Sequence, residues 1–140
     1  MKKRVLILCT GNSARSQMAE GILRRDGGDL FEVESAGVTP GSVRPEAIQV
    51  MREIGIDISA HRSKSADEFI DQEFDTVITV CDNAKETCPV FLGNTVRVHR
   101  NFEDPPPPGV GSDEERHTIF RRVRDEIREW MKDFIAGQAA

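Results

Sequence analysis

The sequence contains no tyrosine and no apolar run close to the roughly 20 residues that a membrane-spanning helix requires. Its basic start, residues 1–4, precedes only four apolar residues, fewer than the roughly 7–15 of a secretory signal. We therefore expect a cytoplasmic protein that makes no membrane contact. A net charge of −5 also lacks the positive excess typical of nucleic-acid-binding surfaces, so we expect no nucleic-acid partner.

Cysteine is scarce as well, with Cys9, Cys81 and Cys88 as the only three. An odd number excludes a fully paired disulfide framework within one chain. In a reducing cytosol thiols stay free by default, and the disulfides found there are mostly transient and catalytic. No CxxC pair of the kind found in zinc sites occurs, and the three histidines stand alone, so we expect no metal ion. Burial as a small apolar side chain is the alternative for each cysteine.

The chain is long enough for one domain, which we expect to span residues 1–140 and to be a monomer. Short apolar runs predict four strands, at 4–9, 30–36, 76–80 and 95–99. Capping residues and helical periodicity predict helices from Ser13 or Ser16 to about 25, and at 45–54, 65–68, 83–88 and 112–134. Helices that separate the strands favour an α/β fold, a four-stranded parallel sheet with helices on both faces. The strand at 30–36 alternates in polarity, so we place it near the sheet edge.

Three segments of interest each follow a predicted strand. Cys9 and Cys81 end or follow the strands at 4–9 and 76–80, and the proline-rich stretch 101–111 follows the strand at 95–99. Ligands of parallel α/β sheets bind beyond the carboxyl ends of the strands. We therefore expect these segments to converge at one edge of the sheet.

The loop after the first strand has the chemistry of an anion site. A strand, a tight loop and a helix start gather several backbone N–H groups around one point, and Arg15 adds a permanently charged fork. We expect Gly11 to permit a tight or left-handed backbone there, and the positive field to lower the pKa of Cys9 so that it is a nucleophilic thiolate. The predicted oxyanion-binding residues are Thr10, Gly11, Asn12, Ser13, Ala14, Arg15 and Ser16.

The segment Cys9–Glu20, CTGNSARSQMAE, resembles the signature of the low-molecular-weight protein tyrosine phosphatase fold, and more closely that of thioredoxin-coupled arsenate reductases. The resemblance extends over nearly the whole chain. It includes Ser35-Ala36-Gly37, Asp57-Ile58-Ser59, the cysteines at 81 and 88, Asn101-Phe102-Glu103-Asp104-Pro105 and Arg122-Val123-Arg124-Asp125-Glu126-Ile127. It implies that Asp104, which stands before a proline, is the general acid, and that the protein contributes to arsenical resistance.

The resemblance also implies a redox relay among the cysteines. Reducing arsenate to arsenite takes two electrons, so two thiols must end as a disulfide. Cys9 would form the arsenate adduct, Cys81 would attack Cys9 and release arsenite, and Cys88 would then attack Cys81. Thioredoxin is the implied reductant, with glutaredoxin or a small thiol as the alternative, and no bound cofactor is expected.

Helical geometry opposes a direct bond between the last two cysteines. If residues 82–88 are helical, Cys81 and Cys88 lie about 10.5 Å apart along the axis, whereas a disulfide needs Cα atoms within about 7 Å. We therefore expect residues 81–92 to form a redox switch that unwinds when oxidised.

A phosphatase that hydrolyses phosphate monoesters is the main alternative. Phosphatases of this fold usually carry aromatic side chains after the acid to grip phosphotyrosine, but here prolines follow Asp104-Pro105. This difference favours the reductase, with weak phosphatase activity as a side reaction. A non-enzymatic thiol site for a soft metal or arsenite is a third possibility, which the cysteine spacing does not favour.

Some arsenate reductases of this type carry a potassium ion near the loop. Asn12, Glu20 and Ser35 match its positions, but the fourth, usually a carboxylate, corresponds to Lys64. We expect the Lys64 ammonium to replace the ion, and therefore no bound potassium.

Overall fold

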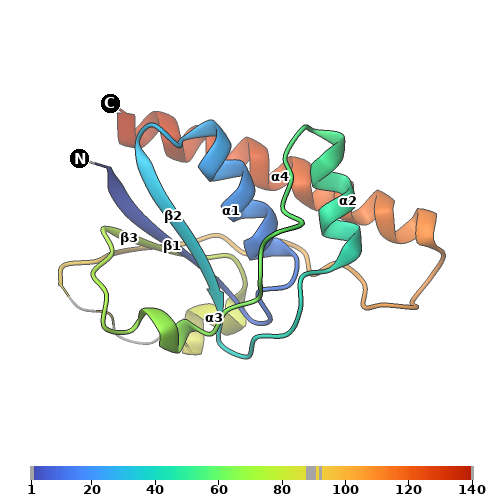
Figure 1. Cartoon of the computed structure of the whole chain (residues 1–140), viewed down its shortest axis with the longest axis horizontal. Helices are drawn as coiled ribbons and strands as arrows, with labels where there is room; N and C mark the ends of the chain where they lie inside the picture. Colours follow the sequence, from blue (N-terminus) through green and yellow to red (C-terminus); the bar gives the residue numbers. More distant parts are fainter. Residues whose placement is uncertain (1, 88–90, 92, 140) are drawn as a thin grey trace.

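Four parallel strands form the centre of the computed structural model, which describes residues 2–87, 91 and 93–139 (Figure 1). They are β1 (Lys3–Cys9), β2 (Phe31–Gly37), β3 (Thr76–Thr79) and β4 (Val96–His99), in the order β2-β1-β3-β4. All three neighbouring pairs are parallel. The predicted parallel sheet is confirmed, and so is the edge position of the strand predicted at 30–36.

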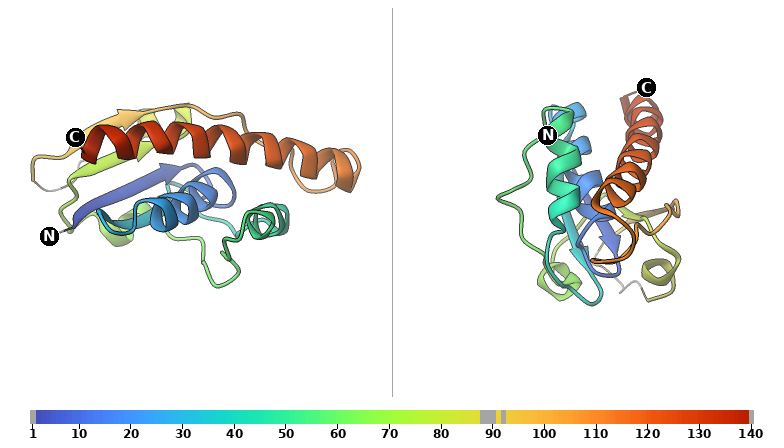
Figure 2. Two further views of the ribbon diagram at one scale, coloured as in Figure 1. Left: turned by 90° about the horizontal axis from the view of Figure 1, so that it is seen from above. Right: turned by 90° about the vertical axis from the view of Figure 1, so that its right-hand side faces the viewer.

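Helices cover both faces of this sheet. They are α1 (Arg15–Asp26), α2 (Pro45–Glu53), the 3-10 helix η1 (Ala66–Phe69), α3 (Asp82–Thr87) and α4 (Asp113–Ala139). The long helices α1, α2 and α4 pack against one another on one side, and η1 and α3 lie on the other (Figures 1 and 2). No helix among the described residues is both long and apolar enough to cross a membrane.

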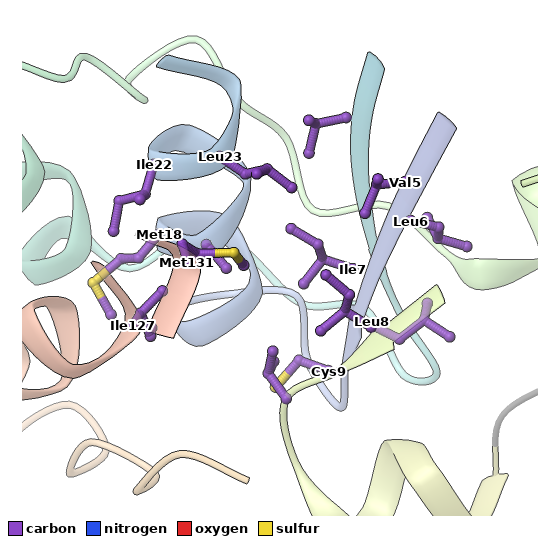
Figure 3. Packing of buried hydrophobic residues seen from close by; sticks show 14 of the residues in the cluster. Val5, Leu6, Ile7, Leu8, Cys9, Met18, Ile22, Leu23, Ile127 and Met131 are labelled. Carbon is purple, nitrogen blue, oxygen red and sulfur yellow. The ribbon is translucent and has the colours of Figure 1, made fainter. Parts of the chain in front are cut away.

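The core is built around β1, whose residues Val5 to Leu8 are fully buried. Figure 3 shows Ile7 directed toward the Met18 and Leu23 side chains of α1, whereas Leu6 points to the other side of the strand. A strand covered on both faces needs apolar residues at every position, which explains why the sequence of β1 does not alternate. This buried strand holds Cys9 at the carboxyl edge of the sheet.

The start of α1 differs from the sequence prediction. Neither Ser13 nor Ser16 caps it: Ala14 occupies the N-cap position, and no side chain there accepts a hydrogen bond. Ser16 lies inside the helix, where its hydroxyl accepts from the Asn12 side chain. The first N–H groups of α1 are therefore not occupied by a side-chain cap. By contrast, the predicted caps at Ser65 and Ser112 are present.

Candidate active site

Two cysteines meet at the carboxyl edge of the sheet. Cys9 is the last residue of β1, and Cys81 follows the neighbouring strand β3 by two residues. Both are free thiols, 3% and 4% exposed, and they are close enough for each to shift the pKa of the other. The predicted convergence of these two residues is confirmed. Cys88 lies outside the described residues.

The loop after β1 has its carbonyl groups occupied and its amide groups free. The carbonyl oxygens of residues 9–13 all accept hydrogen bonds from neighbouring segments. The donors, in loop order, are the backbone N–H groups of Val38, Thr39 and Gly41, the Gln17 side chain and the backbone N–H of Arg44, at 3.2, 2.9, 3.0, 3.1 and 2.8 Å. Within the described part of the chain, no backbone N–H of residues 11–16 donates a hydrogen bond. The loop is therefore held in shape by its carbonyls, and its N–H groups remain for an anion.

Asn12, rather than Gly11, takes the left-handed conformation in this loop. Its φ is 49°, and Asn12 is the one non-glycine residue with a positive φ among those described. Gly11 was predicted to permit a tight or left-handed backbone, and the residue that adopts the left-handed region is its neighbour, because a short polar side chain that bonds locally can also do so. Asn12 is fully buried, and its Nδ2 donates to the hydroxyls of Ser16 and Ser35 at 2.8 and 2.9 Å. Its Oδ1 accepts from Gln17 Nε2 and from Lys64 N, both at 2.9 Å.

Gly37 is a requirement of the loop that sequence reasoning did not identify. A Cβ at Gly37 would lie 2.7 Å from the carbonyl oxygen of Thr10 and 2.9 Å from the backbone nitrogen of Asn12. Both distances are too short for any side chain. A glycine at the end of a predicted edge strand is the sequence signal that could have revealed this close approach.

Arg15 and Asp104 lie side by side at the opening of the loop. Arg15 NH1 donates to the Phe102 carbonyl oxygen at 3.1 Å, and its NH2 lies 3.5 Å from Asp104 Oδ1. The Arg15 side chain is 10% exposed, whereas that of Asp104 is 78% exposed. The structure thus places the predicted anion-binding cation inside the site and the predicted acid at its solvent side.

The pKa values of the two thiols are shifted in opposite directions, which the sequence did not predict. The hydrogen bond to Cys81 and burial raise the pKa of Cys9, although the charge of Arg15 opposes this. Hydrogen bonds from Cys9, Thr10 and the Ala84 backbone lower the pKa of Cys81 to about 5, and Arg15 adds to this effect. The prediction of a lowered pKa at Cys9 is therefore wrong for the ligand-free protein, because in this coupled pair the pKa of Cys9 is raised and that of Cys81 is lowered.

The environment of Cys81 is built from the loop and from α3. The Thr10 hydroxyl lies 3.2 Å from the Cys81 sulfur and accepts a hydrogen bond from Asn83 Nδ2 at 3.1 Å. The Ala84 backbone N–H donates to the same sulfur at 3.4 Å. Thr10 is among the predicted oxyanion-binding residues, and its side chain contacts the second cysteine. These donors stabilise a negative charge on Cys81.

A buried carboxylate lies beneath the loop. Glu20 is 2% exposed and accepts from the Ser35 hydroxyl at 2.5 Å, while Arg24 NH1 lies 2.9 Å from its other oxygen. Lys64 Nζ lies 3.5 Å from Glu20 Oε1, and His61 Nε2 lies 3.6 Å from Glu20 Oε2. Burial lowers the pKa of His61 despite the nearby carboxylate. The Lys64 ammonium thus lies beside Glu20, which is where an ammonium that replaces potassium would have to be.

Comparisons with known proteins place this arrangement in a wider group. A family model described as low molecular weight phosphotyrosine protein phosphatase matches residues 4–139. An arsenate reductase of Halalkalibacterium halodurans is 47% identical over 133 residues, or 95% of each chain. A solved structure described as an arsenate reductase in the phosphate binding state is 34% identical, with a TM-score of 0.77 and 98% of each chain covered. A low molecular weight protein tyrosine phosphatase from T. tengcongensis is 28% identical, with a TM-score of 0.77 over 97% of this chain and 99% of its own.

Proposed function

Because the chain belongs to the low molecular weight phosphotyrosine protein phosphatase family, we propose that it uses this fold to reduce arsenate to arsenite. The observation that carries the proposal is the contact between two free, buried thiols, Cys9 and Cys81, beside a loop with free N–H groups. Hydrolysis of a phosphate ester requires only one nucleophilic cysteine. A two-electron reduction requires a second thiol within reach of the first.

The first step is formation of a covalent adduct. Arsenate binds the free N–H groups of residues 11–16 and the Arg15 guanidinium. The Cys9 proton passes along the hydrogen bond to the Cys81 thiolate, and the Cys9 sulfur attacks arsenic. A hydroxyl group of the arsenate takes a proton from Asp104 and leaves as water. Asp104 suits this role because it lies at the opening of the site beside Arg15.

The second step transfers the electrons. The Cys81 sulfur attacks the Cys9 sulfur, a disulfide forms, and the Cys9–arsenic bond breaks with its electron pair remaining on arsenic. Arsenic is thereby reduced to the trivalent state. The proton that Cys81 had accepted passes to an oxygen of the departing arsenite. Since Thr10 and Ala84 donate to the Cys81 sulfur, they hold it as the second nucleophile.

The third step regenerates Cys9. Cys88 attacks Cys81, which releases the Cys9 thiolate and leaves a bond between Cys81 and Cys88. Residues 82–87 form the helix α3, which separates the two cysteines, so α3 has to unwind for this bond to close. We propose thioredoxin as the external reductant of the final disulfide, with glutaredoxin as the alternative, and a monomer in the cytoplasm as the working form.

Phosphate-ester hydrolysis is the second candidate function. The relative from T. tengcongensis is described as a tyrosine phosphatase, and the first chemical step is the same for both anions. Against it, the sequence has no tyrosine, and prolines follow Asp104 where an aromatic side chain would hold phosphotyrosine. We propose that any phosphatase activity is weak.

One experiment separates these functions. Arsenite formation is measured with thioredoxin, thioredoxin reductase and NADPH, without added metal, beside hydrolysis of an aryl phosphate. We expect arsenite formation in the wild type and its loss in Cys81→Ser, while Cys9→Ser loses both reactions. Aryl phosphate hydrolysis that is fast and unaffected by Cys81→Ser, with no arsenite formed by the wild type, would show that the protein is a phosphatase. Repeating the assay with glutaredoxin identifies the reductant.

A further inference from the structure

The buried carboxylate of Glu46 lies between two arginines, one bonded to the Cys9 loop and the other to the segment that carries Asp104. Glu46 is the second residue of α2, and its side chain is 11% exposed. Its Oε2 accepts hydrogen bonds from Arg44 NH2 at 2.8 Å and from Arg116 Nε at 3.1 Å. The two arginine side chains are similarly enclosed, 14% and 11% exposed. Burial raises the pKa of Glu46, but hydrogen bonds and charge from the two arginines outweigh it, and the pKa is lowered overall.

Arg44 connects Glu46 to the oxyanion loop. Its backbone N–H donates to the Ser13 carbonyl at 2.8 Å, one of the bonds that hold the loop carbonyls in place. Its guanidinium carbon lies 5.1 Å from the centroid of the Phe120 ring of α4. The position of Arg44, and with it the end of the loop, therefore depends on a cation held between a carboxylate and an aromatic face.

Arg116 connects Glu46 to the segment that carries Asp104. Its NH1 donates to the carbonyls of Val110 and Gly111 at 3.2 and 2.7 Å. Four consecutive prolines, 105–108, lie between Asp104 and these carbonyls. Gly109 follows the prolines, but the Val110 N–H donates to the Pro107 carbonyl at 3.2 Å and closes the turn around it. A displacement at residues 110–111 is therefore passed to the prolines, each of which fixes its own φ near −65°.

We propose that Glu46 is a positioning residue, which, through Arg44 and Arg116, fixes the spacing between the oxyanion loop and the segment that carries Asp104. The proposal rests on the proposed function of the loop as an oxyanion site. Arg116 also pairs with Asp113, whose side chain is 84% exposed. Without the Glu46 carboxylate, the two enclosed guanidinium groups lose the buried charge between them and repel each other, because charge interactions are strong where water is excluded. Both segments would then move, and the bound anion would no longer meet the amides and the acid together.

Glu53 offers a matched control on the same helix. It is the last residue of α2 and also binds two arginines of α4: its oxygens lie 2.8 Å from Arg121 NH2 and 2.9 Å from Arg124 NH1. The hydrogen bonds of these two arginines run to residues of α2 and α4. Glu53→Gln thus removes a comparable link between the two helices without a connection to the active site.

The test compares the two glutamine variants by calorimetric binding of inorganic phosphate and by the kcat of arsenite formation. We expect Glu46→Gln to bind phosphate several-fold more weakly and to lose about tenfold in kcat, since small displacements of positioned groups have effects of this order. Glu53→Gln should match the wild type in both. Phosphate binding needs no reductant, so it tests this inference even if the wild type forms no arsenite. Equal behaviour of the two variants in both measurements would overturn it.

Two further variants separate positioning from a general loss of structure. In an Asp104→Ala background, Glu46→Gln should lower kcat by a smaller factor than in the wild type, because the acid that it positions is already missing. Arg116→Lys keeps the positive charge but loses the fork that holds Val110 and Gly111, so it should lower kcat and leave phosphate affinity unchanged. If the kcat of the double variant falls by the product of the factors measured for Glu46→Gln and Asp104→Ala alone, the proposal is contradicted. If Glu46→Gln does not fold, Arg116→Lys provides the test, and a kcat of Arg116→Lys equal to that of the wild type overturns the proposal.

Discussion

Replacing Asn12 is the most demanding test of how the oxyanion loop is held. The Asn12 side chain makes four buried hydrogen bonds, two as donor and two as acceptor. At about 1 kcal/mol net for each, Asn12→Ala loses about 4 kcal/mol. Because the φ of Asn12 is 49°, alanine adds about 1 kcal/mol of backbone strain. The expected total of about 5 kcal/mol is a large share of the roughly 5–15 kcal/mol that stabilises a typical domain.

Asn12→Gly serves as the control because it loses the same hydrogen bonds without the strain. In urea unfolding of the reduced proteins, the free energy of unfolding of Asn12→Gly should therefore exceed that of Asn12→Ala by about 1 kcal/mol, with unchanged m-values. Phosphate should raise the midpoint of the wild type, because it binds only the folded protein, and should raise the midpoints of both variants much less. Two results would refute the reasoning: an alanine variant at least as stable as the glycine variant, or a loss below about 2 kcal/mol for both.

The thiol pair, the relay and the buried lysine give three more predictions. Thiolate absorbance should show one thiolate per molecule forming near pH 5, and Cys81→Ser should remove it; a titration unchanged by this substitution contradicts the assignment. Because the pKa of Cys81 is lowered on folding, its ionisation stabilises the fold as pH rises from about 5 toward about 8.5, and this contribution is lost as pH falls through 5. Cys88→Ser should complete about one turnover and trap a Cys9–Cys81 disulfide, visible by mass spectrometry, because the first two chemical steps need only one pair of thiols; repeated turnover with thioredoxin would exclude the relay. Since Lys64 Nζ lies 3.5 Å from Glu20 Oε1, potassium should not raise turnover above a sodium control at equal ionic strength, and strong activation would refute this.

Local signals in the sequence were sufficient to predict the framework and the position of the first thiol. The unbroken apolar run of β1 indicated a strand buried on both faces, and the residues after it indicated an anion-binding loop beside a helix start. Because the carboxyl ends of parallel strands share one edge, the meeting of Cys9 with Cys81 also followed from topology. These inferences depend on short-range patterns and on one general rule of sheet architecture.

The features that the sequence did not reveal depend on partners far away in the chain. Arg15 acts on the pKa of Cys9 in the expected direction, but burial and Cys81, 72 residues later, outweigh it. Glycine at position 11 permits a left-handed backbone without requiring one, and contacts of Asn12 with residues such as Lys64 decide which residue adopts it. Glu46 likewise resembles an ordinary acidic residue in a first helical turn, and only the fold brings Arg116 to it. No local pattern encodes such distant pairings.

The register between β1 and β3 sets the distance between Cys9 and Cys81. Leu8 is opposite Thr79, so the register brings residue 80 opposite Cys9 and Cys81 one residue further along. A strand spacing of roughly 4.8 Å combined with a rise of roughly 3.3 Å gives a Cα separation of about 5.8 Å. Disulfides span Cα separations of about 4.4–6.8 Å, which includes this spacing. A bond between Cys9 and Cys81 can therefore form across a rigid scaffold, without large motion, whereas the next exchange depends on a segment that must deform. Insertions in loops outside these two strands would leave the distance between Cys9 and Cys81 unchanged, whereas a change in the register of β1 and β3 would alter it.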